Sequence, residues 1–138
     1  MKKRVSILLV IIWMIFIFIM SSFDADTSSN QSGLIVNIIS NILNVSDIDL
    51  ITFIIRKLAH FMEYFILGIL ICNSIYIYNK KNIYGIIICS IYAFSDEIHQ
   101  IFVPGRSFQI RDIIIDILGS ITGIIIFYLY KQKFDKLK

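Results

Sequence analysis

The chain has 138 residues, 57% hydrophobic and 17% charged, and its mean hydropathy is +0.79. This composition excludes an ordinary soluble globular domain and is typical of membrane proteins. The net charge of +3 does not indicate nucleic-acid binding, because most lysines form short clusters beside apolar runs instead of a basic stripe on a soluble face.

The first predicted element is an uncharged run over residues 5–23, which follows the basic residues Lys2 to Arg4. A helix over this run would be about 28 Å long, enough to cross a ~30 Å hydrocarbon core. A signal peptide is the alternative, but cleavage after Ala25 would place Phe23 at a position that prefers small residues. We therefore predict an uncleaved transmembrane helix.

A polar linker at residues 24–33 leads to an amphipathic segment over residues 34–44. Its Leu and Ile residues recur at helical spacing, while Asn and Ser residues fill the opposite face. The segment is too short to span the membrane. We predict an interfacial or re-entrant helix between the first and second transmembrane helices.

Three further spans are predicted from the remaining apolar runs. Ser46, followed by Asp47 and Asp49, is a helix-start signature, and the helix that it opens can run to Tyr78. A polar turn at residues 79–82 and the Pro104-Gly105 turn separate the later runs. The spans cover about residues 58–78, 83–103 and 113–130. The expected fold is a single all-α domain over residues 1–138, a polytopic membrane protein with four transmembrane helices.

The basic residues predict the orientation of these spans. With the N-terminus in the cytoplasm, nine of the thirteen basic residues lie on the cytoplasmic side, and only Arg56, Lys57, Arg106 and Arg111 lie outside. By the positive-inside rule, both termini of this cell-membrane protein should be cytoplasmic.

Ionisable residues of the last three spans then lie at one depth, in the outer third of the membrane. His60 and Glu63 fall about 4–10 Å below the outer boundary, and Asp96 and Glu97 about 10 Å below it. A charge placed toward the bilayer interior costs ~2.5–3.5 kcal/mol, so such residues usually face the bundle and are functional. Helical spacing keeps three sets each on one face: His60 with Glu63 and Tyr64, Asp96 with His99 and Gln100, and Asp112 with Asp116. We predict that they line an outward-facing polar pocket between these spans.

The order of these motifs resembles the VanZ-like family of small bacterial membrane proteins. The resemblance covers most of the chain and rests on Lys57-x-x-His60-x-x-Glu63-Tyr64, Asp96-Glu97-x-His99-Gln100, Pro104-Gly105-Arg106 and Asp112-x-x-x-Asp116-x-x-Gly119. It implies a role at the cell envelope, linked in some members to glycopeptide resistance of the teicoplanin type. It implies no settled molecular activity.

The main functional hypothesis is a site for an amphiphile, either a lipid-linked wall precursor with a phosphate-bearing head group or the lipid tail of an antibiotic. Basic groups at the outer boundary would hold a phosphate, and desolvated carboxylates and imidazoles would transfer protons. The candidate catalytic residues are His60, Glu63, Asp96, Glu97 and His99. The candidate ligand-binding residues are Lys57, Tyr64, Gln100, Arg106, Arg111, Asp112 and Asp116.

Three alternatives stay open. The polar groups could pair only to hold the bundle, as Glu63 or Asp116 with Arg111, Asp96 with His99, and Asp112 with Arg106. The pairs His60/Glu63 and Asp96/His99 could instead supply ligands to a metal ion, although no metal is assigned from the sequence. The chain could also be a non-catalytic accessory that binds a partner membrane protein. Whether the chain is an enzyme, which cofactor it uses and whether it forms a homo-oligomer are left open.

Overall fold

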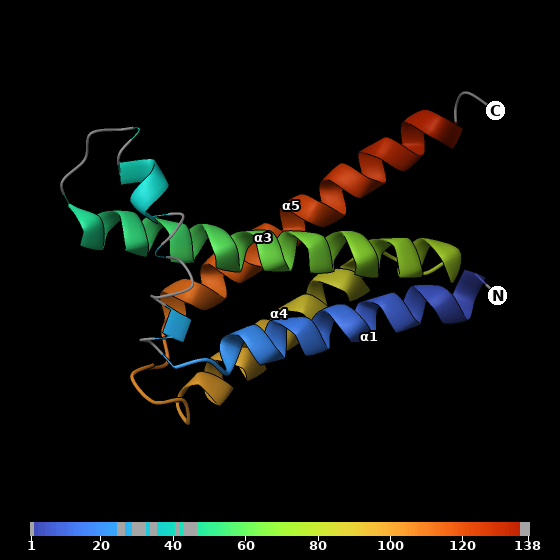
Figure 1. The fold of residues 1–138 in the computed structure, drawn as a ribbon. Coiled ribbons are helices and arrows are strands. Elements are labelled where there is room, and N and C mark those ends of the chain that lie inside the picture. Colours follow the sequence, from blue (N-terminus) through green and yellow to red (C-terminus); the bar gives the residue numbers. More distant parts are fainter. Residues whose placement is uncertain are drawn as a thin grey trace.

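The computed structural model describes residues 2–24, 27–28, 33, 36–40, 42 and 47–135, and the regular structure of these residues is helical throughout. Four helices carry the fold: α1 (Lys2–Ser21), α3 (Ile48–Ile77), α4 (Ile83–Gln100) and α5 (Ile110–Asp135). α1 lies along α3 and α4, and α5 crosses α3 (Figure 1). The beginning of α1 and the end of α5 lie toward the same end of the bundle as the α3–α4 turn (Figure 1).

Three of the described helices are long and apolar enough to cross a membrane: α1 from Lys3 to Ser21, α3, and α5. α4 is not one of them, because the polar residues of its last turns lower its hydropathy. The chain is thus a multi-pass membrane protein by helix length and composition, and the predicted fourth span stays a prediction.

The predicted interfacial helix over residues 34–44 falls partly outside the described residues. Within it, residues 36–40 are helical. Val36 is buried, whereas the side chain of Ile38 is 59% exposed.

The N-cap of α3 is Asp47, one residue after the predicted serine cap. Asp47 Oδ1 accepts a hydrogen bond of 3.0 Å from the backbone N–H of Leu50. Ser46 lies outside the described residues. At the other end the chain turns at Asn79, whose φ of 54° is left-handed. Asparagine tolerates this conformation better than most residues, which makes the predicted polar turn at residues 79–82 a tight one.

α4 ends at Gln100, three residues before the predicted end. Proline cannot continue a helix and disfavours helical backbone in the residue before it, so Pro104 prevents α4 from extending further. The N–H of Arg106 bonds to the carbonyl of Val103 at 3.1 Å, and Gly105 has a φ of 71°. A type II turn requires such a positive φ at its third residue. The turn carries Arg106 back toward the bundle, where it borders a pocket.

Glycines bring α3 and α5 into backbone contact. A Cβ at Gly119 would collide with the backbone oxygen of Phe61, and one at Gly123 with that of Phe65. Gly68 of α3 faces the Ser120 backbone in the same way. In the sequence, Gly119 and Gly123 form a small-xxx-small pattern of the kind that allows helices to approach closely, and this pattern lies at the α3–α5 seam.

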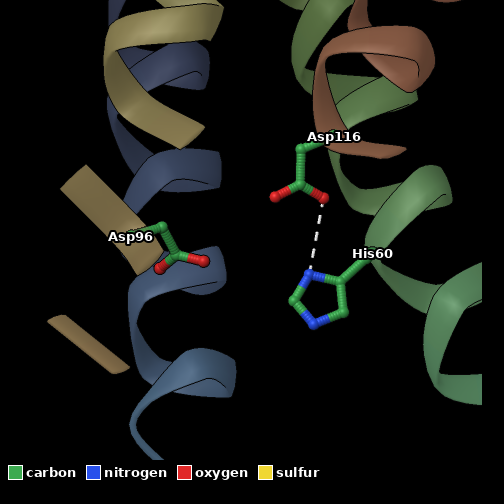
Figure 2. A group of neighbouring side chains, drawn as sticks. All are labelled: His60, Asp96 and Asp116. Carbon is green, nitrogen blue, oxygen red and sulfur yellow. Dashed lines mark ion pairs between the residues drawn. The ribbon is translucent and has the colours of Figure 1, made fainter. Parts of the chain in front are cut away.

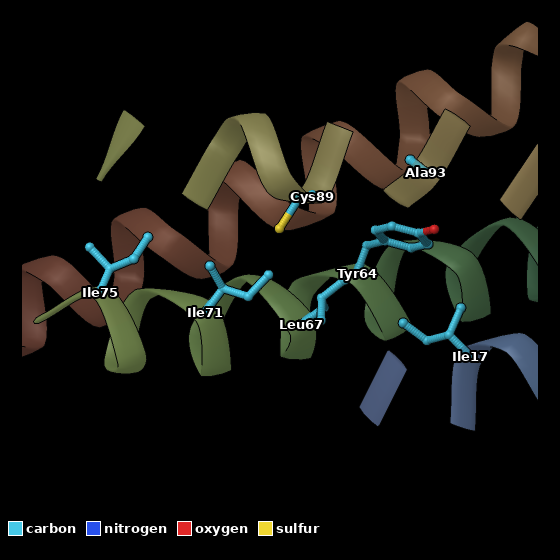
Figure 3. Packing of buried hydrophobic residues seen from close by; sticks show 7 residues of the cluster. All are labelled: Ile17, Tyr64, Leu67, Ile71, Ile75, Cys89 and Ala93. Atoms are coloured by element: carbon cyan, nitrogen blue, oxygen red, sulfur yellow. The ribbon is translucent and has the colours of Figure 1, made fainter. Parts of the chain in front are cut away.

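The apolar core lies beside this seam (Figure 3). It consists of Ile17, Tyr64, Leu67, Ile71, Ile75, Cys89 and Ala93. Cys72 and Cys89 are both buried free thiols. α1 joins the core through Ile17 and two hydrogen bonds, from Trp13 Nε1 to the Glu63 carbonyl at 2.9 Å and from the Tyr92 hydroxyl to the Met14 carbonyl at 2.5 Å.

Candidate functional site

Three ionisable side chains from three helices meet inside the bundle. His60 comes from α3, Asp96 from α4 and Asp116 from α5. The three side chains point into one space between their helices (Figure 2). His60 Nδ1 lies 3.4 Å from Asp116 Oδ1, and one ligand atom from each residue lies within 4.8 Å of the others. Asp96 is 3% exposed and Asp116 is fully buried.

The sequence placed these groups in one layer, but it did not predict which of them would pair. Among the described residues the ion pairs are His60 with Asp116 and Lys57 with Asp112. The pairs expected from a purely structural role are absent among the described residues: Arg111 pairs with neither Glu63 nor Asp116, His99 does not pair with Asp96, and Arg106 does not pair with Asp112.

A second polar group lies at the same end of the bundle, around Gln109. Lys57 Nζ contacts Asp112 Oδ1 and lies 3.4 Å from Gln109 Oε1. The Gln109 backbone N–H donates to Glu97 Oε2 at 2.7 Å, and Glu97 is fully buried. Lys57, Glu97 and Asp112 therefore tie α3 and α4 to the start of α5. Gln109 itself was missed, because a single amide in a loop gives no periodic signal.

Tyr64 and Gln100 are buried between these groups and the apolar core. Tyr64 is fully buried, with its ring centroid 6.1 Å from that of Tyr92, and Gln100 is 2% exposed. No described residue bonds to the Tyr64 hydroxyl or to Gln100 Nε2. Each therefore buries a polar atom without a hydrogen-bond partner among the described residues, and Tyr64 is also part of the apolar core.

Two predicted site residues lie away from the three-residue cluster. His99 Nε2 lies 3.0 Å from the Ser22 hydroxyl, and its ring is 4.4 Å from that of Phe18. Arg111 is exposed, with its guanidinium 5.8 Å from the Phe53 ring centroid. His99 faces the end of α1, and Arg111 faces the outside of α3.

A small pocket opens beside His60. Its volume is about 70 Å³, which holds a few water molecules or one compact polar group. Its lining residues come from α1, α3, the α4–α5 loop and the segment after α1: Met20, Ser21, Ser28, Arg56, Ala59, His60, Glu63 and Arg106. This pocket differs from the one predicted between the last three spans, because α1 and α3 line it and its lining includes no residue of the helices α4 or α5.

Of the lining residues, the sequence singled out only His60, Glu63 and Arg106 as site residues. Arg56 was interpreted as a boundary marker, although it precedes His60 by one helical turn and so shares its face. Ser21 ends α1 and lies beside Asp96. No pattern within α1 pointed to it.

The pocket brings two arginines together. Burial lowers the pKa of the Arg106 guanidinium from its usual range, and the neighbouring charge of Arg56 lowers it further. Asp96, Glu63 and Glu97 attract Arg106 electrostatically, but no described residue accepts a hydrogen bond from its Nε. The lining of the pocket therefore contains two arginine side chains and one carboxylate, that of Glu63, so the basic groups outnumber the acidic one.

A larger cavity of about 600 Å³ lies at the opposite end of the bundle. Its lining includes Lys80, Lys81 and Lys131, together with Tyr76 and Tyr128. The three lysines are among the nine basic residues that the sequence predicts on the cytoplasmic side. No histidine or carboxylate lines this cavity, so it lacks the acid–base groups of the other end.

The amino-acid sequence of this chain matches a known protein family. The sequence profile of the VanZ/LLP1 family matches residues 6–131, a range that contains all the residues of the cluster and of the pocket. The chain belongs to the VanZ/LLP1 family. No curated protein and no solved structure matches it.

In this VanZ/LLP1 chain the motifs that carried the resemblance lie together in space. The histidine of the first motif, the aspartate of the second and the second aspartate of the fourth form the cluster of Figure 2. Arg106 of the Pro-Gly-Arg motif borders the pocket that His60 also lines. These motifs therefore form one connected polar region.

Proposed function

We propose that this VanZ/LLP1 protein binds the anionic head group of an amphiphile at the outer face of the cell membrane. The observation that carries the proposal is the pocket lined by Arg56 and Arg106. Arginine is suited to phosphate because its planar guanidinium donates paired hydrogen bonds. The amphiphile would be a lipid-linked wall precursor or a lipid-bearing antibiotic.

The orientation is part of this proposal. Four spans, with α4 counted among them, place both termini on one side, which agrees with the beginning of α1 and the end of α5 lying toward one end of the bundle in Figure 1. The sequence puts nine of thirteen basic residues on that side, which makes it cytoplasmic by the positive-inside rule. The Arg56–Arg106 pocket then faces outward.

The size of the pocket limits what it can hold. Cavities for whole drug-sized ligands measure about 300–1,000 Å³, several times the 70 Å³ found here. Only a head group would enter. The acyl or prenyl tail would lie on the lipid-facing surface, where residues such as Leu58 and Met62 of α3 are about half exposed.

The proposal concerns binding, and catalysis of a reaction on the bound head group would be a separate activity. His60 and Glu63 line the pocket, so they are the groups that could exchange a proton with a bound head group. Asp96 lies behind His60, and Glu97 bonds to Gln109 instead of facing the pocket. A catalytic role is therefore best tested at His60 and Glu63.

Binding can be tested with the full chain in mild detergent by native mass spectrometry. A polyprenyl pyrophosphate is the probe, and phosphatidylcholine is the zwitterionic comparison. We expect the pyrophosphate to bind, and Arg56→Gln or Arg106→Gln to weaken its binding at least about tenfold, since each removes charge-assisted hydrogen bonds. Arg111→Gln is the matched control and should bind normally, because Arg111 lies over Phe53.

Equal binding by all three arginine variants would overturn the proposal. A partner membrane protein that co-purifies while no amphiphile binds would favour the accessory role instead. The link to resistance is tested by expressing the chain in a teicoplanin-sensitive bacterium. Resistance that persists undiminished in the Arg56→Gln/Arg106→Gln double variant would separate the phenotype from this pocket.

A further inference from the structure

We propose that His60, Asp96 and Asp116 bind one divalent first-row metal ion, of the Zn²⁺ or Mn²⁺ class, between α3, α4 and α5. The proposal rests on the three side chains of Figure 2 and not on head-group binding. It also differs from the ligand pairs expected from the sequence, because each ligand comes from a different helix.

The donor atoms have spacings that a metal ion can bridge. Zinc bonds to nitrogen and oxygen at about 2.0–2.1 Å, so two ligand atoms of a tetrahedral site lie about 3.4 Å apart. The distance from His60 Nδ1 to Asp116 Oδ1 is 3.4 Å. The Asp96 ligand atom lies within 4.8 Å of the other two, and a small rotation of its carboxylate would bring it closer.

Charge also favours a cation here. Asp96 and Asp116 are buried, and a buried carboxylate is costly unless a positive group compensates it. Among the described residues no lysine or arginine forms an ion pair with either one, since Lys57 pairs with Asp112. Arg106 attracts Asp96 only from a distance beyond an ion pair. One divalent ion would neutralise both carboxylates at once.

The carboxylate oxygens are free to act as ligands. Neither oxygen of Asp96 or Asp116, nor His60 Nδ1, has a hydrogen-bond partner of regular geometry among the described residues, although the Ser21 and Gln100 side chains lie beside Asp96. Asp96 and Asp116 are 3% and 0% exposed. They face one another, which is the arrangement of ligands around an ion (Figure 2).

The surroundings fit a metal site as well. One imidazole with two carboxylates suits borderline ions such as Zn²⁺ and Mn²⁺ better than soft ions, which prefer sulfur. The three protein ligands would leave a position for water or another ligand. The pocket beside His60 offers a path from the outer surface, and Glu63 stands on that path.

The test measures metal content of the full chain in mild detergent. After treatment with EDTA and dialysis against Zn²⁺ or Mn²⁺, inductively coupled plasma mass spectrometry should find stoichiometric metal. Asp96→Asn, Asp116→Asn and His60→Gln should each weaken binding at least about tenfold, because loss of even an indirect metal contact costs that much. His99→Gln is the control and should bind normally, because His99 faces Ser22.

Thermal unfolding supplies a second readout. Metal should raise the Tm of the wild type and of His99→Gln, but not that of Asp96→Asn. Without metal, Asp96→Asn should be at least as stable as the wild type, because it removes an uncompensated buried charge. A carboxylate whose role is purely structural pairing would instead lose stability in that variant.

Either of two results would overturn the proposal: no stoichiometric metal in the wild type, or equal metal in Asp96→Asn. The first would mean that protons, not a metal ion, neutralise the carboxylates. Arg106→Gln keeps this test separate from head-group binding, since it should lose the amphiphile and retain the metal.

Discussion

The two ends of the α3–α5 pair are built on different chemistry. From Leu67 to Ile75, α3 buries apolar side chains that pack with Cys89 and Ala93 of α4. Toward the other end, the same two helices bury Lys57, His60, Asp112 and Asp116, several of whose polar atoms lack partners. The comparison indicates that the seam and the apolar half hold the fold, which allows the polar half to keep groups free for a ligand.

The largest effect should come from the seam that both halves share. In Gly123→Ala the new Cβ would collide with the backbone oxygen of Phe65, which cannot move without displacing α3. We expect a loss of more than about 3 kcal/mol, or no folded protein, since overpacking of side chains alone costs 1–3 kcal/mol. Denaturation of the wild type and the variant in detergent measures this loss of stability. Gly33→Ala, with nothing within 4 Å, should have little effect.

The apolar half is tested next, at Leu67. Its side chain is fully buried, so Leu67→Ala leaves a cavity and should cost about 2–3 kcal/mol. The control is Leu118→Ala on α5, whose side chain is 53% exposed. If both variants lost the same stability, the apolar half would not be the part that holds the fold.

The polar half should contribute less to the free energy of unfolding, and the variant Lys57→Met measures this contribution. Lys57→Met leaves Asp112 buried without its partner and should cost about 2 kcal/mol, less than a fully buried pair because the Lys57 side chain is 14% exposed. The double variant Lys57→Met/Asp112→Leu should recover most of this loss. Failure to recover it would show that the pair does more than compensate charge.

The smallest expected effect lies at the beginning of α3. Asp47→Ala removes the hydrogen bond to the Leu50 N–H and should cost about 1 kcal/mol. Asp49→Ala should cost less, since Asp49 contributes only its charge in the first turn. Denaturation of the two variants side by side tests this order, and the reverse order would contradict the assignment of Asp47 as the cap.

Much of this fold follows from the sequence. The apolar runs and their polar turns predicted the helices, and the spacing of Gly119 and Gly123 predicted the close seam. Depth along each helix also placed His60, Asp96 and Asp116 in one layer. These features depend only on position along a helix, which a single sequence records directly.

The partners within the layer could not be predicted in the same way. Adjacent helical residues point about 100° apart, so Arg56 lines the pocket while Lys57 turns to Asp112, and Asp112 is buried while Arg111 is exposed. Which of two neighbours faces inward depends on how each helix is rotated against the next. That rotation is set by tertiary packing, which also brings Ser21 of α1 into the site.

Trp13 is the only tryptophan in the chain, and its indole N–H bonds to the carbonyl of Glu63, the residue that borders the pocket. Indole fluorescence therefore reports on this one contact without any introduced label. A ligand that shifts α1 against α3 would change the wavelength or intensity of that emission. Occupancy of the site could then be followed in real time, by light alone, in the unmodified protein.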